Sequence, residues 1–267
     1  MRSPEHPGKY RMVRWLTRHL IPSEGLVAEV DARVRLSLHP RDWIEYVLLR
    51  DGHYEPLTLA FLTRNLRTAD QAIFAGVNNG LHVIVAARAV GEKGRVIGVD
   101  PQPSAMLRAR RNIDLNGMAG SVRLVAAALG DGVALAHMAW ADSENPGAAS
   151  LLDSGPGLEV PVVPLAAVVD GLCTTTVRLM LLDVQGYEEP ALRGLKEHRP
   201  ELLIVEDSEE YLARAGSSRA RLYSQIRDMG YALHDVFGND VVESGPSPAE
   251  FNVIGVRPGA GVTWCLR

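Results

Sequence analysis

The sequence predicts an α/β fold, a doubly wound, seven-stranded sheet preceded by a helical N-terminal extension. From residue 72 onward, short apolar or β-branched runs alternate with stretches of helical periodicity, which is the pattern of parallel strands joined by crossover helices. The last two apolar runs are separated only by what reads as a short loop. This closing pair predicts an antiparallel hairpin at one edge of the sheet.

Each element follows from its local pattern. The run "AIFA" at 72–75 is apolar at every position, as a strand buried on both faces requires. The stretch 103–117 places Met106, Ala109 and Ile113 on one helix face and ends at Gly117. The other expected strands are 95–100, 122–129, 177–184, 201–206 and the closing runs "YALHDV" and "FNVIGVRP", and the other expected helices are 81–90 and 220–229.

Two stretches depart from this alternation. Residues 1–70 are rich in Arg, Leu and Trp, and we expect mainly helices and connectors there, forming a cover distinct from the domain at 71–267. The stretch 140–160 is rich in Ser, Gly, Pro and Asn and is long for a connection. Long connections in compact domains tend to be lids or binding loops, so we expect this one to border a ligand site.

Composition excludes several classes of protein. The chain has 267 residues, of which 46% are hydrophobic and 22% charged, as in soluble proteins with a core. A net charge of −4 argues against a general nucleic-acid binder, which needs a basic face. No apolar run approaches the ~18 residues of a membrane span, and the N-terminus lacks the apolar core of a secretory signal. The distant Cys173 and Cys265 predict free thiols in a reducing compartment, hence the cytoplasm.

The stretch "FAGVNNG", Phe74 to Gly80, lies between an expected strand and an expected helix. Glycine permits backbone conformations closed to other residues and lets a ligand approach, and the helix that follows offers unpaired N–H groups. The stretch is not a phosphate-binding Walker loop, because no Gly-Lys-Ser/Thr closes it. Its glycines, Gly76 and Gly80, also lack the spacing of a dinucleotide-binding GxGxxG loop.

Asp100 stands twenty residues past Gly80, at the end of the second expected strand. An acid in that place can accept both hydroxyls of an adenosine ribose. A loop with Asn78 and Asn79 suits amino and carboxylate groups better than a diphosphate, which favours S-adenosylmethionine over NAD. The alternative is that Gly76 and Gly80 only form a tight corner and Asp100 caps the next helix.

The blocks that carry a family resemblance are "GHYEP", "FAGVNNGLH", "GRVIGVDPQP", "LRARRNIDLNG", "VRLVAAALGD", "LLDVQGYEEPALRGL" and "PELLIVE", in that order. They resemble the FkbM-type class I methyltransferases, whose pattern runs DxGANxG, an acid with proline, RRNxxLNG, ALGD, IDVEGxExxVLxG and a strand ending in Glu. The match extends over residues ~50–255. The resemblance implies a Rossmann-like domain at 71–267 that binds S-adenosyl-L-methionine and methylates hydroxyls of small molecules, such as secondary metabolites or sugars.

Three positions depart from the family pattern. Phe74 stands where the pattern has the acid at the head of the glycine loop, Asn79 stands in place of a small apolar residue, and Gln185 replaces the Glu of the IDVEG block. The first matters most, because class I enzymes often use that acid to hold the amino group of the donor. Asn79, Asp70 or Glu55 are the candidates to take its place.

Candidate catalytic residues follow from the expected strand ends. Ligands of open α/β sheets bind beyond the carboxyl ends of the strands, and Asp183 and Glu206 end two of them. Either acid could take the proton of an acceptor hydroxyl, and the alternative for each is a capping or solvated role. His82, just inside the helix after the glycine loop, is a third candidate base, with a purely structural helix residue as the alternative.

The remaining assignments are implied by the resemblance. Ala128 and Asp131 would border the adenine, and Asn145 and Ser150 would border the acceptor, the alternative for the latter two being a polar surface loop. Glu188, at the start of an expected helix, is a further candidate substrate residue, and the alternative is an acid that the helix dipole favours there. The implied donor-binding residues are Glu55, Gly76, Asn78, Asn79, Gly80, Asp100, Ala128, Asp131 and Asp183. The His, Cys and Asp residues have no metal-type spacing, so we expect catalysis without a metal.

The leading hypothesis is therefore an S-adenosylmethionine-dependent O-methyltransferase acting on a hydroxyl of a small molecule, without nucleic-acid or membrane-spanning partners. One alternative is a homologue that binds the donor but catalyses a reaction other than methyl transfer. Another is a non-catalytic binding module, motivated by Phe74. The N-terminal segment, with Trp15, Trp43 and Tyr46, would close over the acceptor, or else cover a sheet edge or mediate a homodimer.

Overall fold

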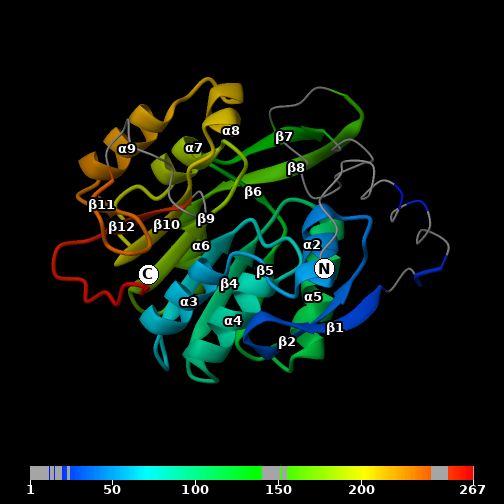
Figure 1. The fold of residues 1–267 in the computed structure, drawn as a ribbon. Helices are drawn as coiled ribbons and strands as arrows, with labels where there is room; N and C mark the ends of the chain where they lie inside the picture. Colours follow the sequence, from blue (N-terminus) through cyan, green and yellow to red (C-terminus); the bar gives the residue numbers. More distant parts are fainter. Residues whose placement is uncertain are drawn as a thin grey trace.

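The structure is a computed structural model that describes residues 12, 15, 20–22, 25–139, 151, 155–241 and 252–266. Its centre is a seven-stranded sheet in the order β11-β12-β10-β9-β3-β4-β5 (Figure 1). The five strands from β10 to β5 pair in parallel, and β12 is antiparallel to both β10 and β11. The doubly wound sheet with an antiparallel edge is thus confirmed. Its strands are β3 (Gln71–Ala75), β4 (Arg95–Val99), β5 (Val122–Val125), β9 (Val177–Leu182), β10 (Leu202–Glu206), β11 (Ala232–His234) and β12 (Asn252–Val256).

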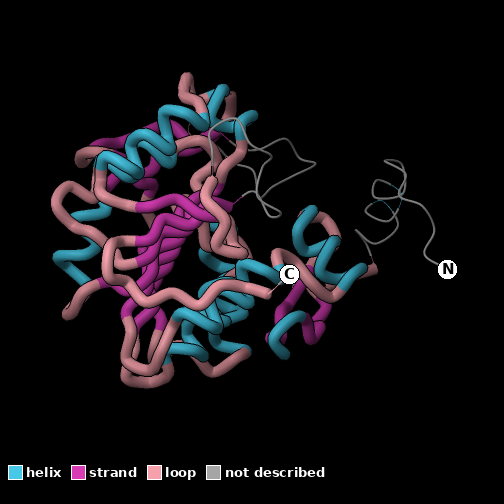
Figure 2. Tube along the Cα trace, turned by 60° about the vertical axis from the view of Figure 1, so that its left-hand side comes forward, coloured by secondary structure: helices cyan, strands magenta, loops and turns pink. Residues whose placement is uncertain are grey.

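Helices cover both faces of this sheet (Figure 2). In β3, Ala72 and Phe74 pack toward one core and Ile73 and Ala75 toward the other, because side chains alternate along a strand. The first core is completed by α3 (Pro56–Asn65), α4 (Leu81–Val90) and α5 (Pro103–Leu115), and the second by α6 (Leu165–Leu172), α7 (Glu188–Arg193), α8 (Glu209–Arg214) and α9 (Arg219–Asp228).

The N-terminal segment is less helical than the sequence predicts. It contains α2 (Trp43–Asp51) and α3, but also an antiparallel pair, β1 (Leu26–Val30) and β2 (Val34–Leu38), joined by the 3-10 turn η1 (Asp31–Arg33). In β2, Val34, Leu36 and Leu38 are fully buried and share a core with α4. Alternation of apolar residues in "VRLSL" was the signal available for this strand. A domain boundary at residue 70 stays a prediction.

Two further expectations were wrong in detail. The expected strand 122–129 is two strands, because β6 (Ala128–Gly130) leaves the central sheet after β5 and pairs with β8 (Gly157–Pro164). Together with β7 (Ala134–Ala139) these form a second, three-stranded sheet in the order β6-β8-β7, which the sequence patterns do not predict. The connection between β11 and β12 is also not short, since it runs from residue 235 to 251.

Candidate active site

Strand register brings the predicted strand-end residues into one row. Ala75 of β3 pairs with both Val99 of β4 and Leu182 of β9, and Leu182 pairs with Val205 of β10. The next residue of each strand or its following loop is therefore Asp100, Gly76, Asp183 and Glu206, side by side across four strands. The chain order of the strands reverses at β3, and such a switch point is where open α/β sheets bind ligands.

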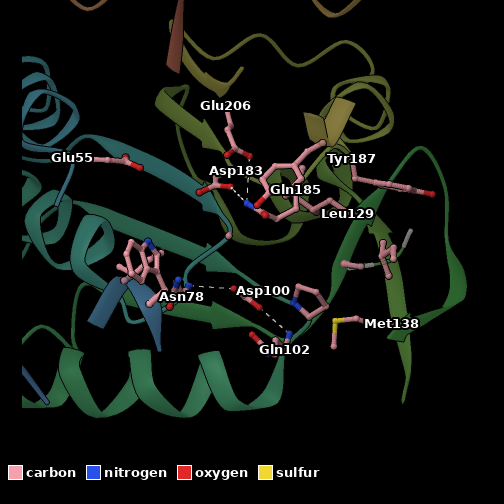
Figure 3. A pocket seen from close by; sticks show the side chains of 18 of the residues that line it. Glu55, Asn78, Asp100, Gln102, Leu129, Met138, Asp183, Gln185, Tyr187 and Glu206 are labelled. Carbon is pink, nitrogen blue, oxygen red and sulfur yellow. Dashed lines mark hydrogen bonds between the residues drawn. The ribbon is translucent and has the colours of Figure 1, made fainter. Parts of the chain in front are cut away.

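A cavity of about 240 Å³ lies at this row (Figure 3). Strand ends, the glycine loop, the second sheet and α2 all contribute to its wall. The lining residues are Trp43, Ile44, Tyr54, Glu55, Gly76, Asn78, Asp100, Pro101, Gln102, Ala128, Leu129, Met138, Leu151, Asp183, Val184, Gln185, Tyr187, Glu206 and Tyr211. Within the described part of the chain this wall carries four carboxyl groups and no Lys, Arg or His side chain.

Asp100 holds the glycine loop in place. Its Oδ2 accepts the backbone N–H groups of Val77 at 2.9 Å and Asn78 at 3.2 Å, and its Oδ1 accepts that of Gln102 at 2.8 Å. A carboxylate offers about four acceptor positions, so one is left for a ligand. Burial raises the pKa of Asp100, although all three N–H groups favour its ionised form. Asp100 therefore anchors the loop and still presents one acceptor position to the cavity, rather than the two free ones that the sequence suggests.

Close packing favours glycine at both Gly76 and Gly80 of the loop. Gly76 has φ +85°, and a Cβ there would lie 2.0 Å from the carbonyl oxygen of Asp183, so no larger residue fits between β3 and β9. Gly80 has φ +89° and faces the backbone of Ala109 on α5. Only Gly76 of the two lines the cavity. The tight-corner alternative is thus part of the explanation, and the loop remains next to the ligand space.

The asparagines of the loop have different surroundings. Asn78 lines the cavity, with a left-handed backbone (φ 48°). Asn79 is buried away from it. The side-chain oxygen of Asn79 accepts the N–H of Leu81 at 3.1 Å, and its carbonyl accepts the amide of Asn112 at 2.8 Å. Asn79 therefore shapes the start of α4, and of the two asparagines only Asn78 lines the ligand space.

Asp183 and Glu206 form a carboxyl pair (Figure 3). The Gln185 amide nitrogen donates to Asp183 Oδ1 at 2.9 Å and to Glu206 Oε2 at 3.4 Å. Burial raises the pKa of both acids, the charge of Glu55 raises that of Asp183 further, and the charge of Asp183 raises that of Glu206. The two acids also share a hydrogen bond, which favours a protonated Glu206 donating to an ionised Asp183.

Glu55 supplies the fourth carboxyl of the wall. Its backbone is left-handed (φ 47°) immediately before Pro56, where α3 begins. His82 Nε2 lies 3.2 Å from Glu55 Oε2, and the amide of Asn252 donates to the same oxygen at 3.5 Å. Burial, followed by the charge of Glu55, raises the pKa of Tyr54. His82 does not line the cavity, so the structure places it behind Glu55 rather than at the predicted catalytic position.

Phe74, which stands in place of the expected loop acid, cannot bind the amino group of the donor. Phe74 is fully buried in the core between the sheet and its covering helices. Asp70 lies at the opposite end of β3, where its carboxylate accepts the N–H of Arg67 and its carbonyl accepts that of Arg95. Among Asn79, Asp70 and Glu55, only Glu55 lines the cavity.

Several predicted site residues lie elsewhere. Asp131 is exposed, with its carboxylate 3.6 Å from Arg193 on α7, and does not line the cavity. Glu188 is buried, and its Oε1 accepts the N–H groups of Val184 and Gly186, both at 3.1 Å. Burial raises the pKa of Glu188 to about 7. Two further predicted residues, Asn145 and Ser150, lie outside the described residues.

Most residues on the apolar side of the cavity were not predicted from the sequence. Ala128 was predicted, but its neighbour Leu129 and Met138 of β7 reach the cavity through the second sheet, which sequence patterns did not reveal. Tyr187 and Tyr211 start or lie within short helices whose placement is tertiary. Tyr54 had a usable signal, because it adjoins Glu55 in the "GHYEP" block.

A protein-family model supports the resemblance. The model for the methyltransferase FkbM domain matches residues 75–233, which is more than half of the chain. The chain belongs to the FkbM methyltransferase family. It is therefore a methyltransferase, and its methyl donor is S-adenosylmethionine. The matched range runs from the end of β3 into β11, so it includes all four strand-end residues of the site, Gly76, Asp100, Asp183 and Glu206.

Solved structures similar to this FkbM-family chain share little sequence with it. A methyltransferase from Geobacter sulfurreducens is 16% identical, with a TM-score of 0.48 and coverage of 95% of this chain and 98% of that one. The O-methyltransferase TomG from Streptomyces achromogenes is 13% identical, with a TM-score of 0.47 and coverage of 96% and 100%. No curated protein matches the chain. In its described part, no helix has the length and apolarity to cross a membrane.

Proposed function

We propose that this FkbM-family enzyme is an O-methyltransferase that methylates a hydroxyl of a small molecule, with Asp183 as the proton acceptor. The observation that carries the proposal is the position of Asp183. It stands beside Gly76 in the row of strand ends and lines the same cavity as Asp100. A base at that place adjoins the site where donor and acceptor must meet.

The chemistry of the wall fits S-adenosylmethionine. Asp100 has one acceptor position left for a ribose hydroxyl, and Pro101, Ala128 and Leu129 offer an apolar surface for adenine. The carboxylates of Glu55 and Asp183 suit the positively charged part of the donor. When bound, the donor supplies a methyl group already activated by the sulfonium charge.

Glu55 takes over the task of the missing loop acid in this proposal. Its carboxylate faces the cavity, accepts the amide of Asn252 from β12 and lies 3.2 Å from His82 Nε2 of α4. A protonated His82 would form an ion pair with it, so two elements distant from Glu55 in the sequence support this carboxylate at the wall. This arrangement supports donor binding even though Phe74 has replaced the loop acid. It therefore weakens the case for a non-catalytic binding module.

Asp183 would take the proton of the acceptor hydroxyl as its oxygen forms the new bond to carbon. A proton acceptor must be ionised beforehand, and the protonated Glu206 and the Gln185 amide both donate to Asp183. A carboxylate whose pKa is raised by burial is also a stronger base than an exposed one. Charge separation is limited, because the proton moves to an adjacent acceptor inside the cavity.

The acceptor side is proposed from the aromatic residues of the wall. Trp43 of α2 is 41% exposed yet lines the cavity, and Tyr187 and Tyr211 lie on the same wall as the acid pair. Aromatic rings with polar edges suit a hydroxylated ring or sugar. The N-terminal segment thereby contributes to the acceptor site through α2, as proposed for Trp43 from the sequence.

Two measurements test the proposal. Calorimetry with S-adenosylhomocysteine should show binding to wild type and to Asp183→Asn. Methyl-labelled donor incubated with a panel of sugars, polyols and phenols should label a product with wild type and with the control Asp170→Asn, an exposed acid, but not with Asp183→Asn. Donor consumption in the absence of any acceptor would contradict methyl transfer, and labelling at nitrogen would contradict the O-methyl assignment.

A further inference from the structure

We propose that Gln185 is a positioning residue whose side-chain amide keeps Asp183 as the ionised member of the Asp183–Glu206 pair. The inference rests on the proposed function, because the state of Asp183 matters for catalysis only if Asp183 takes the proton. It concerns a position where this chain departs from the family pattern, which has Glu.

The geometry of the amide favours one acid over the other. Its nitrogen is a donor only, and it lies 2.9 Å from Asp183 Oδ1 but 3.4 Å from Glu206 Oε2. A donor stabilises the ionised form of its acceptor, and the shorter contact does so more strongly. Gln185 therefore biases the single proton of the pair toward Glu206.

The turn that carries Gln185 is tightly held. Gln185 has a left-handed backbone (φ 55°). Residues other than glycine seldom adopt this conformation unless the surrounding structure enforces it. Both of its neighbours, Val184 and Gly186, donate their N–H groups to Glu188 Oε1. A Cβ at Gly186 would lie 2.4 Å from the carbonyl oxygen of Tyr211, so α8 closes the turn from the other side. Glu188, predicted as a substrate residue, thus acts here through the backbone around Gln185.

A glutamate at position 185 would have the opposite effect. Its carboxylate would place a third acid within hydrogen-bond distance of Asp183 and Glu206, and it would have no N–H to offer either of them. Repulsion would then force an additional proton into the group. The amide avoids that and leaves one proton for two acids.

Other titratable groups face the pair and act on it together with Gln185. Glu55, just before α3, and Glu188 on α7 add negative charge, whereas His82 on α4 favours an ionised Asp183 when protonated. Tyr54 and Tyr211 lie near both acids and stay uncharged, because burial raises their pKa values. Within the described surroundings, the Gln185 amide donates hydrogen bonds to both acids.

Carboxyl carbon NMR tests the effect of Gln185 on the ionisation of Asp183 in the absence of donor and acceptor. Aspartate and glutamate are labelled with carbon-13 at the carboxyl, and the signals of Asp183 and Glu206 are assigned by difference with Asp183→Asn and Glu206→Gln. In wild type we expect Asp183 to ionise first and Glu206 to stay protonated above neutral pH. Gln185→Met, similar in shape but without a donor, should raise the Asp183 midpoint by about one to two pH units. The control Gln225→Met, whose amide donates to the Glu189 carbonyl, should leave it unchanged.

The outcomes are separable. Gln185→Glu keeps the shape of the side chain and should add one protonated carboxyl at pH 7, so it carries the test if Gln185→Met does not fold. The proposal is overturned if Glu206 ionises before Asp183 in wild type, or if both Gln185 variants leave the Asp183 midpoint where the control has it. Since the titration contains no substrate, its result does not depend on the labelling experiment with Asp183→Asn. Each proposal can therefore fail alone.

Discussion

The side-chain amide of Asn112 ties Asn79 of the glycine loop to the N-terminal strand pair. Its nitrogen donates to the Asn79 carbonyl at 2.8 Å, and its oxygen accepts the N–H of Ser37 in β2, also at 2.8 Å. Four residues on, Asn116 bonds both the N–H and the carbonyl of Arg35 in the same strand. Of the two asparagines of the "RRNIDLNG" block, both thus bond β2 and only Asn112 also reaches the loop.

This relationship predicts different effects for two matched substitutions. Asn112→Ala removes the hydrogen bonds that this side chain makes with the buried N–H of Ser37 and with the Asn79 carbonyl, so the free energy of unfolding should fall by about 2–4 kcal/mol. Binding of S-adenosylhomocysteine, measured by calorimetry, should weaken as well, because the loop loses a support. Asn116→Ala should lower stability without weakening binding. If both variants lost the same binding affinity, the hydrogen bond from Asn112 to the loop would not be what supports donor binding.

Gly76→Ala should be severely destabilising. The new Cβ would lie 2.0 Å from the Asp183 carbonyl oxygen, which forces β3 and β9 apart. We expect a loss above about 4 kcal/mol in chemical denaturation, or failure to fold. Gly117→Ala has a similar φ of +70° but open space around it, so it should cost only about 1–2 kcal/mol. If the two variants were equally stable, backbone strain rather than contact with Asp183 would explain Gly76.

The contribution of Glu206 to protein stability should fall as pH rises from acid to alkaline conditions. Burial and the charge of Asp183 raise the pKa of Glu206 in the folded state. A raised pKa stabilises the fold fully below the unfolded value of about 4.3 and loses that effect progressively above it. Glu206→Gln should therefore raise Tm more at pH 8 than at pH 4.5. The exposed control Glu210→Gln should show no such difference, and an equal shift at both pH values would count against a retained proton.

Glu55→Gln should weaken donor binding if Glu55 replaces the loop acid. A charged hydrogen bond inside a cavity is lost, so Kd for S-adenosylmethionine should rise about ten- to a hundredfold. Asp70→Asn, at the opposite end of β3, should leave Kd unchanged. Calorimetry on both variants checks the assignment. Unchanged binding by Glu55→Gln together with weaker binding by Asp70→Asn would show that Asp70, and not Glu55, replaces the loop acid.

Much of the central fold could be predicted from local patterns. The apolar run at 72–75, the helix at 81–90 and the later alternation identify elements that the structure places within a few residues. Strands β1 and β7 were missed because about half of their residues are exposed, so the period-two alternation of apolar residues is weak. The division of the expected strand 122–129 depends on β6 finding β8 as a partner, which no local pattern encodes.

For the site, the sequence by itself determined which residues end the parallel strands, and so identified Asp100, Asp183 and Glu206. That is a local property, since each strand is a short apolar run with a polar residue after it. Only the tertiary structure decided that register aligns these residues in one row, that Glu55 faces the cavity and that Asp131 does not. Pairing between distant segments sets side-chain distances, and those distances govern which carboxyl keeps its proton.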